Sequence, residues 1–403
     1  MIHVHSKALE STVEVERIIG KISRKPSDPT LIFVGGIHGN EPAGILAMQE
    51  VFDQIQKNHL PIKGNVFFLA GNLQALDRGV RYLKEDLNRM WTDQRVNQLL
   101  SKEETSNHPE LEEQAVLLEH ISNILDSNSG PFYFFDIHTT SSHTQPFLTV
   151  NDSLLNRAFT SQYPLPVILG IEEYLNGPIL SFINEKGYVA FGFEAGQHDE
   201  LTAIENAVSF CYLSMVYGQV LDQETIDYDY HFNKLSESTS HIQHTFEIVY
   251  RHDIAASEKF VMKPGFTNFQ EVAKGDLLAH INGTAIQAQH KGRIFMPLYQ
   301  EKGTDGYYQI KKIPKSILRL SAKMRKLKLD KMLTWLPGIR WMDDQKSALI
   351  INKKIARFMA KELLHLLGYR SINRGSQYLH AYNREAKSRT SDYRETCWIK
   401  RKG

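Results

Sequence analysis

The chain has 403 residues, of which 42% are hydrophobic and 23% are charged, a composition typical of a globular protein with roughly two or three domains. Its two cysteines, Cys211 and Cys397, are too few for a disulfide framework or a cysteine-based zinc site. No apolar run approaches the roughly 18 residues of a membrane span, and the N-terminus lacks the pattern of a secretory signal. We therefore expect a cytoplasmic protein without a transmembrane segment.

The net charge of +1 conceals a strong asymmetry along the chain. Residues 314–403 contain 22 Lys and Arg against 7 Asp and Glu, which leaves 25 basic and 39 acidic residues in the rest of the chain. Such a division suggests a separate C-terminal extension with its own surface. That surface could contact an anionic partner or could dock on the acidic part of the same chain.

The first part of the chain, to about residue 230, alternates short apolar runs with longer amphipathic ones. The apolar runs predict β-strands over 29–36, 65–72, 131–138, 147–150, 166–170 and 188–196. Helical spacing of apolar residues predicts helices over 41–58, 111–128 and 201–220. This alternation favours an α/β layered domain with a mostly parallel or mixed central sheet, whose chemistry lies in loops at the carboxyl ends of strands.

The remainder of the chain has a different character. Residues 222–243 are polar and are predicted to be a linker. Short apolar runs separated by Gly, Asn and Asp then predict a small β domain, and the basic extension includes a predicted amphipathic helix over 348–369. We therefore expect three domains, at residues 1–230, 243–313 and 314–403.

A histidine and a carboxylate stand three residues apart where the first predicted strand of this α/β part opens into a helix. His38 and Glu41 follow the apolar run "LIFVGG", and His138 ends the apolar run "FYFFDIH". Zinc hydrolases commonly use three His or carboxylate ligands and leave one coordination position for water. Asp136 points to the same side of an extended strand as His138 and could accept its second imidazole N–H. These residues are the candidate metal site.

Four motifs, "GGIHGNEPAG", "DLNR", "DIHTTSS" and "GFEAG", occur in this order along the chain, and together they are specific for one protein family. Over roughly residues 10–313 the chain resembles the succinylglutamate desuccinylase and aspartoacylase family of zinc-dependent hydrolases, which are related to the zinc carboxypeptidases. The resemblance implies a zinc-carboxypeptidase-like layered domain with one Zn²⁺ per chain, held by His38, Glu41 and His138. It also implies that the small β domain caps the active site.

The same resemblance implies roles for further residues. The family's catalytic glutamate corresponds to Glu194, which would act as the general acid and base. Arg81 would polarise the scissile carbonyl and stabilise the oxyanion, while Asn88 and Arg89 would hold a substrate carboxylate. Of the two tyrosines in "GTDGYYQI", Tyr307 is preferred as the residue that closes the pocket.

The sequence departs from aspartoacylases at one position. Those enzymes carry a carboxylate-binding arginine about ten residues before the catalytic glutamate, where this chain has Asn184, with Lys186 as the nearest cation. This difference weakens the case for N-acetylaspartate as the substrate. The basic extension has no counterpart in the family.

We therefore predict a zinc-dependent amidohydrolase that removes a succinyl- or acetyl-type group from a small, anionic N-acyl amino acid. One alternative is a zinc carboxypeptidase that acts on short peptides or peptidoglycan fragments. Another is a non-catalytic protein whose basic extension binds an anionic membrane or nucleic acid, although the sequence has no nucleic-acid motif. The helix of the extension more readily packs on the body of the protein or forms the interface of a homo-oligomer.

Overall fold

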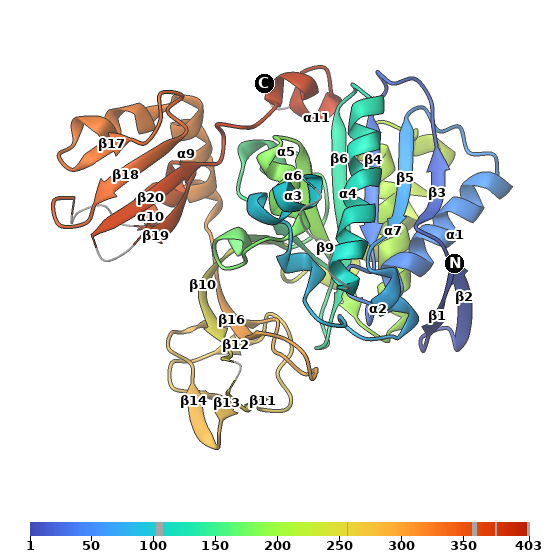
Figure 1. Ribbon diagram of the computed structural model, residues 1–403, viewed down its shortest axis with the longest axis horizontal. Helices are drawn as coiled ribbons and strands as arrows, with labels where there is room; N and C mark the ends of the chain where they lie inside the picture. Colours follow the sequence, from blue (N-terminus) through green and yellow to red (C-terminus); the bar gives the residue numbers. More distant parts are fainter. Residues whose placement is uncertain (102–107, 256, 357–360, 375–376, 401–403) are drawn as a thin grey trace.

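A computed structural model describes residues 1–101, 108–255, 257–356, 361–374 and 377–400. Figure 1 shows a large α/β part, a small β part beneath it and a C-terminal part beside it. We call them the body (residues 1–242), the β region (245–313) and the extension (314–400). Among the described helices, none is both long and apolar enough to cross a lipid bilayer.

The centre of the body is a mixed sheet of eleven strands, in the order β12-β15-β16-β10-β8-β7-β9-β6-β4-β5-β3. Its strands are β3 (Ile18–Ile22), β4 (Thr30–Gly35), β5 (Asn65–Ala70), β6 (Phe132–Thr140), β7 (Phe147–Val150), β8 (Val167–Leu169), β9 (Val189–Gln197), β10 (Thr245–Asp253), β12 (Glu271–Val272), β15 (Gly292–Phe295) and β16 (Asp305–Lys312). The central strands β5, β4, β6 and β9 are parallel to one another. The predicted α/β fold with a mixed sheet is confirmed.

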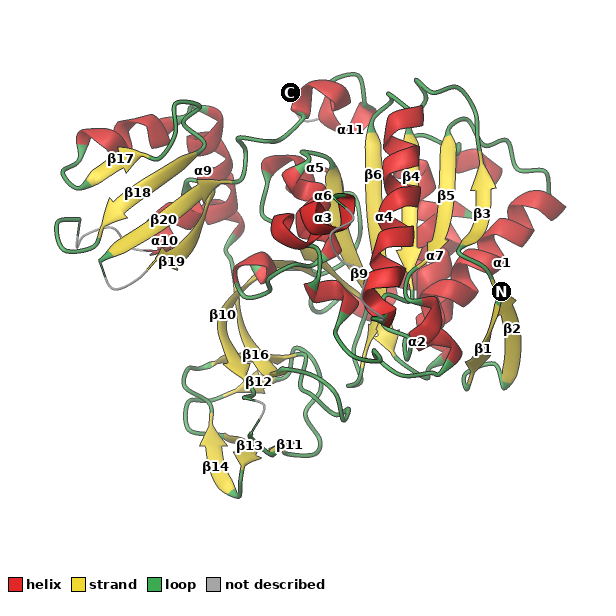
Figure 2. Ribbon diagram, in the orientation of Figure 1, coloured by secondary structure: helices red, strands yellow, loops and turns green. Residues whose placement is uncertain are grey.

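Helices cover both faces of this sheet (Figure 2). They are α1 (Ala43–Lys57), α2 (Leu73–Asp77), α3 (Asp93–Leu100), α4 (Pro109–Ser127), α5 (Leu154–Thr160), α6 (Ile179–Glu185), α7 (Leu201–Tyr217) and α8 (Tyr228–Thr239). Leu31 and Phe33 of β4 pack in the apolar core that contains α1 and α7, whereas Ile32 and Val34 pack in the core that contains α4. Every second residue therefore faces the same layer, as the pleat of a strand requires.

The prediction of a linker over 222–243 is wrong, because this segment contains the helix α8. Its buried residues His231, Leu235 and Thr239 recur every four positions and so lie on one face. This helix packs against α7. The three predicted helices of the body are confirmed as α1, α4 and α7.

The β region extends the central sheet. Strand β10 pairs with β8 of the body in parallel and with β16 in antiparallel register. A separate three-stranded sheet is formed by β11 (Phe260–Met262), β13 (Leu277–Ile281) and β14 (Thr284–Gln287). The division into three domains stays our proposal, with the first two joined by backbone hydrogen bonds.

The extension contains a four-stranded antiparallel sheet packed against short helices. Its elements are α9 (Lys315–Lys326), η4 (Leu329–Trp335), β17 (Ile339–Trp341), β18 (Ala348–Asn352), α10 (Lys361–Leu366), β19 (Tyr369–Arg374), β20 (Tyr378–Asn383), η5 (Thr390–Tyr393) and α11 (Cys397–Lys400). The helix predicted over 348–369 is wrong at its start, where β18 places Leu349 and Ile351 in the core of the extension. Residues 361–366 are helical as predicted, and 357–360 lie outside the described residues.

Buried ion pairs attach the extension to the body. The Arg325 guanidinium lies 2.8 Å from the Asp152 carboxylate, and Arg384 lies 2.9 Å from Glu172 and 2.6 Å from Glu173. The side chains of all five residues are less than a tenth exposed. The basic extension therefore docks on the acidic body of its own chain through these contacts.

The last residues of the extension return to the main core of the body. Tyr393 donates its hydroxyl to the Phe132 carbonyl at 2.5 Å and accepts the Val189 N–H at 3.0 Å. Trp398, in α11, is also buried in this core. Tyr393 and Trp398 thus contribute to the packing behind β6 and β9.

Candidate metal and catalytic site

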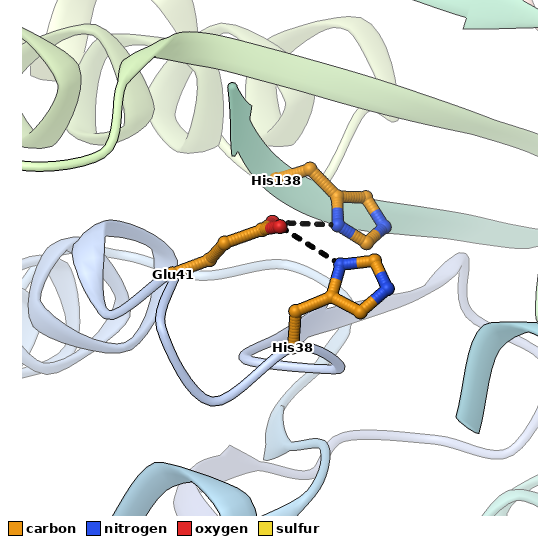
Figure 3. Close-up of side chains that lie close together, drawn as sticks. All are labelled: His38, Glu41 and His138. Carbon is orange, nitrogen blue, oxygen red and sulfur yellow. Dashed lines mark hydrogen bonds and ion pairs between the residues drawn. The ribbon is translucent and has the colours of Figure 1, made fainter. Parts of the chain in front are cut away.

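The candidate metal ligands come from the ends of two neighbouring parallel strands. After β4, Gly36 adopts a left-handed conformation (φ +68°), and the chain passes through His38 and Glu41 before α1 begins. His138 lies near the carboxyl end of β6, which pairs with β4. Carboxyl ends of adjacent parallel strands lie at the same sheet edge. Potential ligand atoms of His38, Glu41 and His138 consequently lie within 4.8 Å of one another (Figure 3).

The two imidazoles turn corresponding nitrogen atoms towards Glu41. Its two carboxylate oxygens lie 2.8 Å from Nδ1 of His38 and 2.9 Å from Nδ1 of His138. The opposite nitrogen, Nε2, lies 3.1 Å from Asp86 in His38 and 2.7 Å from Asp136 in His138. Donation of Nε2–H to these aspartates would leave both Nδ1 lone pairs directed at a common centre.

This donor set fits a divalent metal such as zinc. All three candidate ligands are buried, and within the described part of the chain Nδ1 of His38 has no hydrogen bond of acceptable geometry despite its proximity to Glu41. Two imidazole nitrogens and a carboxylate are a common zinc ligand set in hydrolases. Asp136 occupies the supporting position expected from the sequence. Asp86, which supports His38, was not singled out although it begins the "DLNR" motif.

The buried charges of the site control one another's ionisation. Burial opposes ionisation of Glu41, but His38 and His138 lower its pKa well below the usual range. Burial likewise opposes protonation of His138, but Asp136 and Glu41 raise its pKa. The region therefore stabilises opposite charges in close contact, and a metal cation would supply the positive charge that these carboxylates favour.

Glu194 lies beside this group, on strand β9. It is directly opposite His138 in the parallel pairing of β6 and β9, and it is only 5% exposed. Its Oε2 atom is buried and has no hydrogen-bond partner among the residues that the structure describes. Burial, together with the Glu41 and Asp136 carboxylates, raises the pKa of Glu194 to about 8 against the attraction of His138 and Arg81. Such a carboxyl group can exchange a proton near neutral pH.

The two arginines and the asparagine of the "RYLKEDLNR" segment also line the cavity. Arg81 lies 3.3 Å from Glu41 and 3.1 Å from Asp86, and Arg89 lies 3.1 Å from Asp305. The Asn88 amide accepts the N–H of Ile179 at 3.0 Å and lies near His138. Asp305, at the start of β16, was missed because its contact with Arg89 spans more than 200 residues.

The structure places Tyr308, and not the preferred Tyr307, in the wall of the cavity. Successive residues of β16 point to opposite faces. Tyr307 is fully buried in the core of the β region, where its ring stacks on His252. The choice of Tyr307 was therefore wrong, since a one-residue shift along a strand exchanges the two faces.

Asn184 has a structural environment. Its amide oxygen accepts a hydrogen bond from Asn156 at 2.7 Å, and its amide nitrogen donates to the Ala190 carbonyl at 3.1 Å. It does not line the catalytic cavity. A further ionisable residue of that cavity is His198, whose pKa is lowered by burial and whose Nδ1 lies 2.8 Å from the Thr139 hydroxyl. The sequence signal that could have identified His198 was its position four residues after Glu194.

The cavity itself has a volume of about 130 Å³. Charged groups form the end nearest the candidate metal ligands, and the β region contributes residues between 296 and 308. The segment between residues 171 and 180 contributes an apolar wall that consists of Ile171, Leu175, Pro178 and Leu180. Gly177 lets this wall approach the Arg89 backbone, because a Cβ atom there would lie 2.3 Å from the Arg89 carbonyl oxygen. The site thus combines ionic groups with a short apolar wall.

Comparisons with known proteins agree with this geometry. Residues 27–203 match the model of the succinylglutamate desuccinylase/aspartoacylase catalytic domain. The succinylglutamate desuccinylase of Photorhabdus laumondii is 31% identical over 150 residues, which are 37% of this chain and 45% of that protein. The succinylglutamate desuccinylase of Pseudoalteromonas atlantica is 24% identical over 295 residues, which are 68% of this chain and 79% of that protein.

The fold is also similar to that of a solved structure. The succinylglutamate desuccinylase/aspartoacylase from Rhodobacter sphaeroides has a TM-score of 0.54 and 16% sequence identity, covering 75% of this chain and 91% of that one. The family model ends at residue 203, and the first relative is matched over less than half its length. Residues 27–203 thus match the catalytic domain of the succinylglutamate desuccinylase/aspartoacylase family.

Proposed function

We propose that the protein is a zinc-dependent amidohydrolase that removes a succinyl- or acetyl-type acyl group from an N-acyl amino acid. The observation that carries this proposal is the convergence of His38, Glu41 and His138 beside Glu194 and Arg81 in one cavity. The named activity of the relatives supports the choice of N-acyl amino acids as the substrate class.

Each part of the cavity has a role in this proposal. Zinc held by the two histidines and Glu41 would supply a Lewis acid that polarises the scissile carbonyl and acidifies the attacking water. Glu194 would take a proton from the water and donate one to the leaving nitrogen. The Arg81 guanidinium would donate hydrogen bonds to the carbonyl oxygen as negative charge develops there.

Substrate binding follows from the remaining wall residues. Arg89 and Asn88 supply hydrogen-bond donors that suit a carboxylate on the substrate. The chain between residues 296 and 308 closes one side of the small cavity, which favours a small substrate over a long peptide. A carboxypeptidase would instead need this side to admit a peptide chain.

The test is amine release from a panel of N-acetyl, N-succinyl and N-formyl amino acids by the zinc-loaded protein. We expect hydrolysis that a strong chelator abolishes and added zinc restores. Glu194→Gln should retain about one zinc per chain and lose about 10²- to 10⁴-fold in kcat/KM, which is the usual contribution of a general acid–base. The exposed Glu224→Gln is the matched control and should retain wild-type activity.

Two outcomes would contradict the proposal. Wild-type turnover by Glu194→Gln would exclude the assigned acid–base role. Hydrolysis of peptide C-termini by a zinc-loaded protein that leaves the whole acyl panel intact would identify a carboxypeptidase.

A further inference from the structure

A second and larger cavity, with a volume of about 460 Å³, lies between the body and the extension. Its body side is formed by the start of α3, the segment 171–177 and α6. The extension closes it with residues of β19 and β20 and the chain that follows them, including Arg370, Tyr382 and Arg384. Its size lies within the range of about 300–1,000 Å³ that is typical of small-molecule sites.

This interdomain cavity adjoins the catalytic cavity. Asn151 and Leu175 line both of them. Elsewhere the segment 171–178 separates the two cavities, because Ile171 and Pro178 line the catalytic cavity and Gly177 lines the interdomain cavity. The two cavities are therefore adjacent at Asn151 and Leu175.

The interdomain cavity contains a cation without a partner. The Arg370 guanidinium forms no ion pair and donates no hydrogen bond to any group that the structure describes, and its Nε atom is buried. The other two cations of this cavity are paired, Arg384 with Glu172 and Glu173, and Lys387 with Glu185. A partly buried guanidinium without an acceptor is unfavourable, and binding of an anion would relieve this cost.

The orientation of Arg370 is set by the sheet of the extension. It is paired with Tyr382 across β19 and β20, so the two side chains share one face of the sheet. The neighbouring Tyr369 and Ala381 point to the opposite face, where they pack in the core of the extension. Arg370 is thereby directed away from that core and into the cavity.

Buried ion pairs hold both walls in position. Arg384 binds Glu172 and Glu173 in the separating segment, and Arg325 binds Asp152, the neighbour of Asn151. These contacts fix the extension against the elements that line the catalytic cavity. The cavity is therefore preorganised, which reduces the cost of ordering on ligand binding.

We propose that the two cavities form one substrate cleft, in which Arg370 of the extension binds a carboxylate at the far end of the substrate. This inference rests on the proposed function and narrows its substrate class. The preferred substrate is then an N-acyl dipeptide. Its scissile amide joins the acyl group to the first amino acid, and the second amino acid ends in a free carboxylate.

Direct binding separates this proposal from the chemistry. Isothermal titration of the full-length Glu194→Gln protein uses three probes: N-acetyl-Ala-Ala, its C-terminal amide, and N-acetyl-Ala. Addition of Arg370→Gln should weaken binding of the free dipeptide acid about tenfold or more, the effect of losing a hydrogen-bonded charge. The amide and N-acetyl-Ala should change less than about twofold. Arg370→Lys should restore part of the loss, and Arg319→Gln on the exposed face of α9 is the matched control.

Three results would overturn the inference. The first is that the dipeptide acid binds equally well with and without Arg370→Gln. The second is that Arg370→Gln weakens the binding of the acid and of the amide equally. The third is that N-acetyl-Ala does not compete with the Arg370-dependent binding. Hydrolysis of the acyl panel, combined with binding of the dipeptide acid that Arg370→Gln leaves unchanged, would refute the inference alone. Arg370-dependent binding by a wild-type protein that hydrolyses no member of the panel would retain the anion site and refute the proposed function.

Discussion

Replacement of Arg384 by Gln tests whether the ion pairs between the extension and the body stabilise the protein. Arg384 contacts both Glu172 and Glu173, and His365 lies 2.7 Å from Glu173. Both carboxylates are 3% exposed, and the Arg384 side chain is 8% exposed. The substitution leaves two buried carboxylates close together without their shared guanidinium.

The size of the effect follows from this burial. Removal of one partner from a buried ion pair typically costs about 3–5 kcal/mol, because the other charge stays buried and uncompensated. With a urea m-value of about 3 kcal/mol/M, a loss of about 3 kcal/mol lowers the unfolding midpoint by about 1 M. Arg319→Gln, on an exposed position of α9, should change the midpoint by far less.

The assay is urea unfolding followed by circular dichroism for the wild type and both variants. Adding Glu172→Gln and Glu173→Gln to Arg384→Gln should recover much of the lost stability, because the buried carboxylates that lost the Arg384 guanidinium are then neutral. The amide oxygen introduced by Glu172→Gln could still accept the Asp152 N–H that the Glu172 carboxylate accepts at 3.4 Å. Equal midpoints for Arg384→Gln and Arg319→Gln would refute a stabilising role for these ion pairs.

Three further predictions concern the site and its surroundings. Asp86→Asn should weaken zinc binding about 10–100-fold in a chelator competition, because Asp86 orients His38; unchanged affinity would exclude that role. Tyr308→Phe should raise KM about fivefold, which corresponds to about 1 kcal/mol for a lost hydrogen bond, whereas Tyr307→Phe should leave KM unchanged. A larger increase in KM for Tyr307→Phe than for Tyr308→Phe would restore the sequence-based choice of Tyr307. Burial opposes ionisation of Asp152, but neighbouring arginines hold its pKa below the usual value. Its contribution to the free energy of unfolding should therefore be complete above about pH 5 and be lost progressively as the pH falls from about 4 through the lower folded-state pKa. Asp152→Asn should abolish this part of the acid sensitivity in unfolding experiments.

The extension shows most clearly which features follow from the local sequence pattern and which depend on tertiary contacts. The sequence pattern over 348–369 is compatible with a helix, but pairing with β17 and β20 makes residues 348–352 a strand. A short apolar run has no periodicity that distinguishes a buried strand from a helix, so the partner strands decide. The same holds for Tyr393 and Trp398, whose burial depends on a core assembled from residues more than 150 positions earlier.

Local pattern was enough to predict the α/β class, the helices α1, α4 and α7, and the set His38, Glu41 and His138 as candidates for one site, whereas Glu194 was assigned from the family resemblance. These predictions depend on periodicity and on the rule that parallel strands present their carboxyl ends at one edge. Three-dimensional contacts were needed to show that Tyr308 and not Tyr307 lines the cavity, that Asp305 contacts Arg89, and that Arg370 faces a second cavity. Those facts depend on strand register and on contacts between distant segments, and neither is encoded in the spacing of neighbouring residues.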